Sequence, residues 1–146
     1  SLIFFALSFK TSRYPSNLKW GDYDIEYLID TTGVFLTKEK AEKHKVPYFI
    51  MCAPPKDDTP QFMVNANEDK YSGQSIVSNA SCTSNCLIPV LKFLNDNYTI
   101  IDGNFNTIHA ATASQKTVDT TKMNKRTCRS IFNNIIPKFH ISILSG

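Results

Sequence analysis

Short runs of β-forming residues alternate with stretches that carry helix signals, and this alternation constrains the fold of the chain more than any other feature. The runs Tyr27–Thr31, Tyr48–Cys52 and Ser75–Ser78 predict three strands. Between the first two strands, Thr37 can cap a short helix that is expected to end by Pro47. Strands separated by helices are typical of a parallel sheet with crossover connections, so the sequence predicts an α/β fold.

A longer helix is expected to begin near Cys82. Ser81 is a natural capping residue directly before it, and Pro89 lies inside it, where a proline should kink the helix. Apolar residues recur at helical spacing along this segment, at Leu87, Val90, Leu91 and Leu94.

The composition allows one modest core and excludes several classes of function. The chain has 146 residues, of which 42% are hydrophobic and 12% aromatic, and its net charge of +3 comes from scattered basic residues. Specific binding to nucleic acid is therefore not expected. The apolar run Leu2–Leu7 is too short to span a membrane and is interpreted as a buried strand. The four cysteines lack the paired spacing of a zinc site, so no metal is expected, and reduced thiols fit a cytoplasmic protein.

Cys82 is the candidate nucleophile because it follows a strand directly and opens a helix. The unpaired N–H groups and the dipole of a helix start stabilise negative charge. A free cysteine has a pKa of about 8.5, and a helix amino end together with a nearby imidazole lowers it. The alternative, a buried inert thiol, stays open.

His109 follows after one helix and one turn, on a segment whose alternation from Phe105 onward predicts a strand. If the helix packs on the sheet, the imidazole can lie beside Cys82, hold its thiolate as an ion pair and take a proton. Two alternatives stay open: a histidine satisfied within a core, and a zinc site with Cys86 and Cys128 as further ligands.

Hydroxyl groups surround both candidate residues and suit an anion. Ser81 and Thr83 flank Cys82, while Thr112 and Ser114 follow the histidine segment. Such hydroxyls, with backbone donors, can bind phosphate, although ordinary helix capping explains Ser81 equally well.

The segment Ser78–Leu87 closely resembles the active-site signature of the glyceraldehyde-3-phosphate dehydrogenase family. Four further stretches agree with the family in the same order: Lys19–Asp22, Thr31–Phe35, His109–Asp119 and Asn134–Pro137. By this resemblance the chain is identified as a truncated or fragmentary member of the family.

The resemblance implies the fold and the cofactor. Residues 1–81 would be the later part of a partial Rossmann-type NAD-binding domain, and residues 82–146 the start of an α+β catalytic domain. The positions that match cofactor contacts of the family are Arg13, Thr32, Gly33 and Cys52. The family also implies NAD as cofactor, a homo-tetramer when full length and a cytoplasmic location.

The resemblance further implies a reaction. Cys82 would attack the aldehyde of glyceraldehyde 3-phosphate to form a thiohemiacetal, and His109 would act as base while hydride passes to NAD. Inorganic phosphate would then cleave the resulting thioester to give 1,3-bisphosphoglycerate. Ser81 and Thr83 would hold that phosphate, and the pair Thr112 and Ser114 that of the substrate.

Two departures from the family pattern set limits to this interpretation. No G-x-G-x-x-G turn occurs in the sequence, and Cys52 stands where the family usually has a serine. These 146 residues alone are therefore expected to be inactive. The alternatives are a non-catalytic remnant that acts by binding another protein, and a cysteine hydrolase that uses Cys82 and His109.

Overall fold

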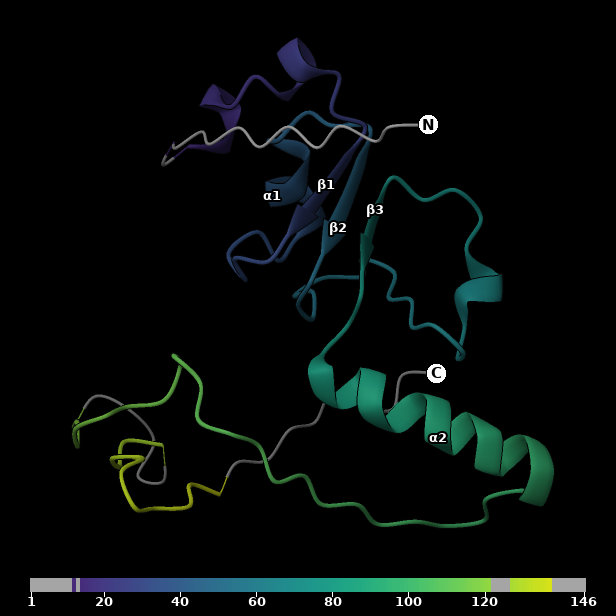
Figure 1. The fold of residues 1–146 in the computed structure, drawn as a ribbon, viewed down its shortest axis with the longest axis vertical. Coiled ribbons are helices and arrows are strands. Elements are labelled where there is room, and N and C mark those ends of the chain that lie inside the picture. Colours follow the sequence, from purple (N-terminus) through teal and green to yellow (C-terminus); the bar gives the residue numbers. More distant parts are fainter. Residues whose placement is uncertain (1–11, 13, 122–126, 138–146) are drawn as a thin grey trace, which may run out of the picture. The chain divides into compact units, whose positions relative to one another are not determined.

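The chain consists of two compact units, residues 1–101 and residues 102–146. The structure is a computed structural model that describes residues 12, 14–121 and 127–137 (Figure 1). The run Leu2–Leu7, interpreted above as a strand, and Arg13 lie outside the described residues.

A three-stranded parallel sheet forms the centre of the first unit. Its strands are β1 (Tyr27–Asp30), β2 (Tyr48–Met51) and β3 (Ile76–Ser78), in the order β1-β2-β3. The register pairs Tyr27 with Tyr48 and Phe49 with Ile76. The α/β fold with a parallel sheet is therefore confirmed, and each strand lies within the run that predicted it.

Helix α1 (Lys38–Glu42) forms the crossover between β1 and β2. As predicted, Thr37 caps it: the Thr37 Oγ1 accepts a hydrogen bond from the Lys40 N–H over 3.4 Å. The helix ends well before Pro47, and Lys45 then adopts a left-handed conformation with a φ of 54°. Three short 3-10 helices complete the unit at η1 (Pro15–Asn17), η2 (Trp20–Tyr23) and η3 (Glu68–Lys70).

The core of the first unit lies where α1 packs on the sheet. Ala41 of α1 and two residues of β2, Phe49 and Met51, are each exposed by 1% or less. Partly buried apolar side chains surround them, namely Leu28, Phe35, Val46 and Ile76. Burial of apolar surface is the main stabilising contribution, so this small cluster holds β1, β2 and α1 together.

Helix α2 (Cys82–Tyr98) follows β3 and begins where the sequence predicts. Pro89 lies in its interior, while the kink expected there stays a prediction. Of its residues only Ser84 is buried, and two members of the expected apolar stripe, Val90 and Leu94, are 54% and 39% exposed. The other two members, Leu87 and Leu91, are half-buried, so the stripe is only partly covered in the part of the chain that the structure describes.

The second unit contains no helix or strand among its described residues, 102–121 and 127–137. The strand expected at Phe105–His109 is therefore wrong. A strand needs backbone pairing with a neighbour, and the sheet of the described residues consists of β1, β2 and β3. Turns and backbone hydrogen bonds order this unit instead. The Thr120 N–H donates to the Cys128 carbonyl, and the Ile131 N–H donates to the Lys116 carbonyl, each over 2.9 Å.

Candidate active site

The carboxyl ends of the three parallel strands bring separate segments to one edge of the sheet. The Cys52 N–H donates to the carbonyl of Asp30 over 2.9 Å, and the Asn79 N–H donates to the carbonyl of Met51 over 2.8 Å. These two bonds continue the ladder just past the strand ends. In open α/β sheets this edge is where ligands bind, so it is the place to look for a site.

The turn after β1 is held by the side chain of its last residue. Asp30 Oδ1 accepts a hydrogen bond from the Thr32 N–H over 3.0 Å, and Thr32 Oγ1 accepts from the Val34 N–H over 3.2 Å. Gly33 has a φ of 67°, which favours glycine. Nothing lies within 4 Å of a Cβ built on Gly33, so the positive φ rather than a close approach of another group is what favours glycine here.

Cys52 lies directly after β2, between the ends of the two neighbouring strands, and its side chain is exposed. It shares this edge of the sheet with Thr32 and Gly33, and the assignment of the three residues to one cofactor site stays a prediction.

The junction between β3 and α2 is tightly bonded. The buried Ser78 donates its hydroxyl to the Ala53 carbonyl over 2.7 Å and accepts from the Ala80 N–H over 2.9 Å. The side-chain amide of Asn85 donates to the Asn79 carbonyl over 2.6 Å. Ala80 is 3% exposed and has a φ of 54°, a left-handed conformation that costs a non-glycine residue about 1–2 kcal/mol. Such strain persists where the surrounding bonds hold it, and it is typical of functional sites.

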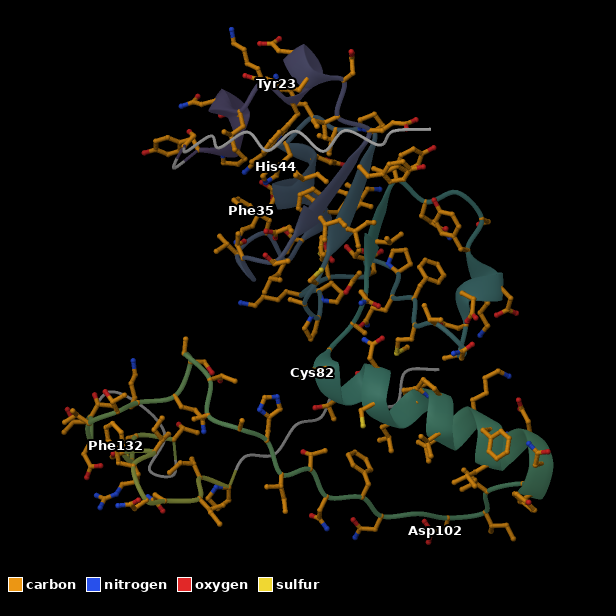
Figure 2. All side chains as sticks on the ribbon, in the orientation of Figure 1. Tyr23, Phe35, His44, Cys82, Asp102 and Phe132 are labelled. Carbon is orange, nitrogen blue, oxygen red and sulfur yellow. The ribbon has the colours of Figure 1, made fainter. Side chains whose placement is uncertain are left out.

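Cys82 is the first residue of α2, and its side chain is exposed (Figure 2). Ser81 caps the helix: its Oγ accepts from the Ser84 N–H over 3.0 Å and lies 2.8 Å from the Ser84 Oγ. Thr83, in the same first turn, is half-buried. The start of a 17-residue helix stabilises negative charge, so it favours the thiolate form of an accessible cysteine.

In the second unit, His109 is exposed and makes a local hydrogen bond. Its Nδ1 lies 2.6 Å from the carbonyl of Ala110, a distance at which the Nδ1–H donates. In the neutral imidazole this leaves Nε2 as the basic nitrogen. This tautomer suits a general base that acts through Nε2.

Thr112 and Ser114 are brought together by the turn that follows His109. Their hydroxyl oxygens lie 3.0 Å apart, and both side chains are exposed. Gln115 closes this turn because its Oε1 accepts from the Thr112 N–H over 2.9 Å while its own N–H donates to the Thr112 carbonyl over 3.0 Å. Two adjacent hydroxyls on one turn can bind the oxygens of a single anion.

The site residues thus form two groups. Thr32, Gly33, Cys52 and the Ser81–Thr83 segment lie in the first unit, whereas His109, Thr112 and Ser114 lie in the second. Cys82 and His109 therefore lie in different units, and their pairing stays a prediction. Among the described residues, no three His, Cys, Asp or Glu side chains gather as a metal ion would require.

The sequence reasoning missed two residues that build this edge of the sheet, Asp30 and Ser78. An aspartate two positions before a threonine and a glycine is a signal for a side-chain-capped turn, so Asp30 was detectable. The hydrogen bond that Ser78 accepts from the Ala80 N–H is likewise local, whereas its bond to the Ala53 carbonyl joins segments 25 positions apart and has no local signal.

The structure is thus that of an α/β protein with a candidate thiol nucleophile. The exposed cysteine lies at a helix start, beside the carboxyl edge of a parallel sheet. Residues 81–142 match the family model described as "Glyceraldehyde 3-phosphate dehydrogenase, C-terminal domain". The chain belongs to the glyceraldehyde-3-phosphate dehydrogenase family.

Several curated relatives are named glyceraldehyde-3-phosphate dehydrogenase. Glyceraldehyde-3-phosphate dehydrogenase of Bacteroides fragilis (strain YCH46) is 50% identical over 127 residues, which cover 84% of this chain and 38% of that protein. Glyceraldehyde-3-phosphate dehydrogenase A of Escherichia coli (strain K12) is 50% identical over 129 residues, or 86% of the chain and 39% of that protein. The cytosolic enzyme of Leishmania mexicana is 47% identical over 131 residues, or 87% and 40%. The chain thus spans about 40% of the length of the relatives it matches.

No helix among the described residues has both the length and the apolar character needed to cross a membrane.

Proposed function

We propose that these residues carry the thiol chemistry of a phosphorylating, NAD-dependent oxidation of glyceraldehyde 3-phosphate. The observation that supports this most directly is the exposed Cys82 at the capped start of α2, beside the carboxyl edge of the sheet. The family relationship supports the reaction class.

In the proposed reaction, the Cys82 thiolate attacks the aldehyde carbon and forms a thiohemiacetal. The start of α2 stabilises the thiolate before the attack, and its N–H groups can receive the oxygen that becomes negative. His109, acting through Nε2, removes the hydroxyl proton as the carbon is oxidised to a thioester. Inorganic phosphate then displaces Cys82 and releases 1,3-bisphosphoglycerate.

Two pairs of hydroxyl groups are proposed as phosphate sites. Ser81 and Thr83 flank Cys82 and would bind the attacking phosphate, with Ser81 also keeping its role as helix cap. Thr112 and Ser114 would bind the phosphate of the substrate, since their hydroxyl oxygens lie 3.0 Å apart.

NAD would be held in part by the turn at Thr32 and Gly33 and by Cys52. These residues fit such a group because all three lie exposed at the edge of the sheet where open α/β sheets bind ligands. The chemistry that NAD supplies when bound is acceptance of the hydride. A cytoplasmic location and a homo-tetrameric assembly of the complete enzyme belong to the same proposal.

The test is a chimera in which this chain replaces the matching residues of the Bacteroides fragilis relative. We expect the chimera to form NADH from glyceraldehyde 3-phosphate and phosphate. Cys82→Ser should abolish the reaction, because no thiohemiacetal can form. His109→Asn should lower kcat by about 10²–10⁴-fold, the usual contribution of a general base.

Cys86→Ser is the matched control, because Cys86 is also an exposed cysteine of α2. It should keep the rate of the parent chimera. A chimera that folds, binds NAD and turns over substrate at the same rate with and without the Cys82→Ser change would contradict the proposal. A folded chimera without activity would favour the alternative of a non-catalytic protein.

A further inference from the structure

Asp102 and Gly103 form the single aspartate–glycine dipeptide of the sequence, and no asparagine precedes a glycine anywhere in it. Both residues are exposed, and the segment 101–112 around them contains no helix or strand. Neither residue has a backbone–backbone hydrogen-bond partner among the described residues. The peptide bond between them is therefore accessible to water and is not held by secondary structure.

The side chain of Asp102 lies against the backbone nitrogen of its neighbour. The Gly103 N–H donates to Asp102 Oδ1 over 2.7 Å, at the short end of the range for such bonds. Since Oδ1 is bonded to Cγ, the same contact keeps the nitrogen close to the carboxyl carbon. Two reacting groups held together in one molecule react much faster than two groups that must meet by diffusion.

Gly103 leaves the approach of the two groups unhindered, because a glycine has no Cβ to crowd its own nitrogen. Nothing lies within 4 Å of a Cβ built on Gly103, and the glycines with positive φ among the described residues are Gly33 and Gly73. The fold therefore does not require a glycine at position 103. An alanine would fit there without strain, so Gly103→Ala can test reactivity without disturbing the structure.

We propose that Asp102 is a site of spontaneous isomerisation to isoaspartate, with water as the co-reactant. The Gly103 nitrogen loses its proton and attacks Cγ of the protonated Asp102 carboxyl, from which one oxygen leaves as water, and a succinimide ring forms. A second water molecule then opens the ring. Opening at the former peptide carbonyl leaves the chain joined through Cγ, which is isoaspartate, whereas opening at Cγ restores aspartate. One water is released and one is consumed, so the net reaction is an isomerisation.

The product changes the backbone at a defined place. An isoaspartyl linkage runs through Cβ and Cγ of Asp102 and so adds one atom to the main chain. Asp102 is the first residue of the second unit, and the added atom lies in the connection that leads to His109. The inference does not rest on the proposed function, because the reaction needs Asp102, Gly103 and water.

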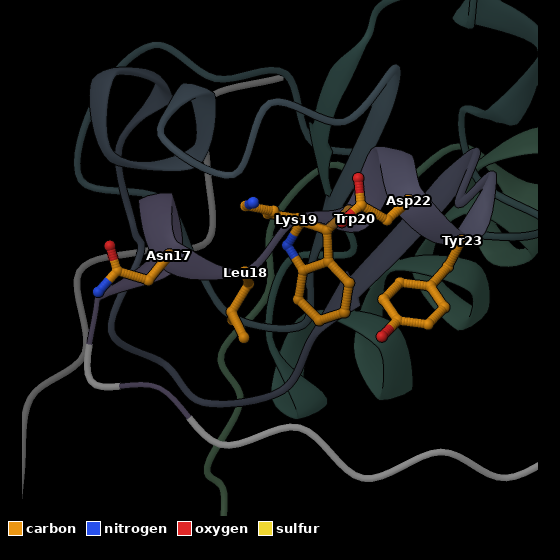
Figure 3. A pocket seen from close by; sticks show the side chains of 6 residues that line it. All are labelled: Asn17, Leu18, Lys19, Trp20, Asp22 and Tyr23. Atoms are coloured by element: carbon orange, nitrogen blue, oxygen red, sulfur yellow. The ribbon is translucent and has the colours of Figure 1, made fainter.

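Asp22 provides a comparison within the same chain, because it is exposed but lies in the 3-10 helix η2. The side chains of Trp20, Asp22 and Tyr23 line a shallow hollow (Figure 3). The Trp20 Nε1–H donates to His44 Nδ1 over 3.4 Å and so ties this helix to the segment after α1. Since its backbone is held and Tyr23 carries a large side chain, Asp22 should isomerise far more slowly than Asp102.

Asp58 provides a second comparison, since it is exposed and lies outside any helix or strand. The nitrogen that would attack its carboxyl belongs to Thr59, a β-branched residue that is 5% exposed. The Thr59 N–H donates to Asp57 Oδ1 over 3.1 Å, so it is directed to the carboxylate of Asp57. Exposure of an aspartate is thus not sufficient, and Asp58 should stay unchanged.

The experiment is incubation of the complete 146-residue chain in H₂¹⁸O at neutral pH and physiological temperature, with samples taken over several weeks. Peptide mapping with electron-transfer fragmentation distinguishes isoaspartate from aspartate. We expect isoaspartate to accumulate at Asp102 and to carry one ¹⁸O atom, because the water that opens the ring supplies that oxygen. The folded chain should react at least as fast as a free peptide of residues 100–105, because the structure holds the reacting groups together.

Asp102→Glu is the matched control, because it keeps the charge but would have to close a larger ring, and it should lose the isomerisation. Gly103→Ala should slow the reaction several-fold, because its Cβ hinders the attacking nitrogen. No isoaspartate at Asp102, slower formation than in the free peptide, or a product without ¹⁸O would overturn the proposal. Equal accumulation at Asp22 or Asp58 would overturn it as well. All of these outcomes are read from the parent chain, so they remain available if a variant does not fold.

Discussion

Cys82 differs from the other cysteines in the backbone that surrounds it. Cys52 follows a strand, Cys86 lies in the second turn of α2, and Cys128 is half-buried in an irregular segment. Only Cys82 combines exposure with the first position of a helix of 17 residues. The thiolate is the reactive form of cysteine, and this position stabilises it.

We predict that limiting iodoacetamide at neutral pH labels Cys82 faster than the other three cysteines. The measurement is peptide mapping by mass spectrometry after short reaction times. Cys86 serves as an internal control, because it is exposed on the same helix but lies beyond its first turn. Faster labelling of Cys52 or Cys86 would show that the helix start does not activate Cys82.

His44 leads to a prediction about stability and pH. Burial lowers its pKa below the ordinary value of about 6.5, so the unfolded chain binds a proton more readily than the folded chain. The contribution of neutral His44 to stability is therefore present above pH of about 6.5 and is lost as the pH falls below that value toward the folded pKa.

Urea unfolding between pH 7.5 and 5.5 measures this contribution. The free energy of unfolding of the parent protein should fall with decreasing pH, and His44→Gln should remove that part of the slope. The carboxylates with lowered pKa, Asp57 and Glu68, titrate at more acidic pH and do not interfere. Equal slopes in the parent and in His44→Gln would contradict the prediction.

At the scale of elements, helix α2 has a well-formed N-terminal cap and yet contains a residue that is unfavourable in a helix interior. In its first turn the Ser81 hydroxyl accepts a hydrogen bond from the Ser84 N–H and lies beside the Ser84 hydroxyl. In its interior, Pro89 has no N–H to donate to the preceding turn. The ion pair between Lys92 and Asp96, at 2.9 Å, is exposed and contributes little.

We predict that Pro89→Ala stabilises α2, by up to about 3 kcal/mol, because it restores a backbone hydrogen bond and removes a steric clash. Circular dichroism should show more helix, and urea unfolding a higher midpoint. Lys92→Ala is the control in the same helix and should leave the stability nearly unchanged, because its ion pair is exposed. A loss of stability in Pro89→Ala would mean that the proline is required by the packing of the helix.

The strand expected at Phe105–His109 was wrong because local residues alone do not determine a strand. Its alternating residues are compatible with a strand, but a strand also needs a partner, and periodicity carries no information about one. The helix starts were predictable because a capping hydroxyl acts on residues only three positions away.

For the whole molecule, exposed apolar side chains are the dominant feature of α2 and the segment after it. Val90, Phe93 and Tyr98 of α2 are 54%, 63% and 76% exposed, and Ile101 is 97% exposed. Several exposed apolar side chains so close along the chain are typical of a site of protein contact.

We predict that the 146-residue chain associates with itself at micromolar concentration. Sedimentation velocity over a concentration series measures this. Phe93→Asp should weaken the association, whereas Val64→Asp, the same kind of change at a residue 69% exposed in a loop, should not. A parent chain that stays monomeric throughout the series would exclude this surface as an interface.

We also predict that these 146 residues, tested alone, neither bind NAD tightly nor oxidise glyceraldehyde 3-phosphate. A dinucleotide draws much of its binding from a glycine-rich turn and a helix start that hold the pyrophosphate, and no G-x-G-x-x-G occurs in this sequence. Calorimetry with NAD and absorbance at the NADH band provide the readouts, with the chimera as positive control. Micromolar binding together with steady turnover would contradict the prediction.

The sequence by itself determined the strands, the helix caps and the position of Cys82 at a helix start. These features depend on neighbouring residues: β-forming runs, a hydroxyl before a helix, and a thiol after it. Tertiary structure alone decided that Trp20 and His44 meet, since Trp20 comes from η2 and His44 from the segment just past α1. It also decided that Phe105–His109 forms no strand. The physical reason is that burial and backbone pairing depend on which distant segments pack together, and that depends on the whole chain.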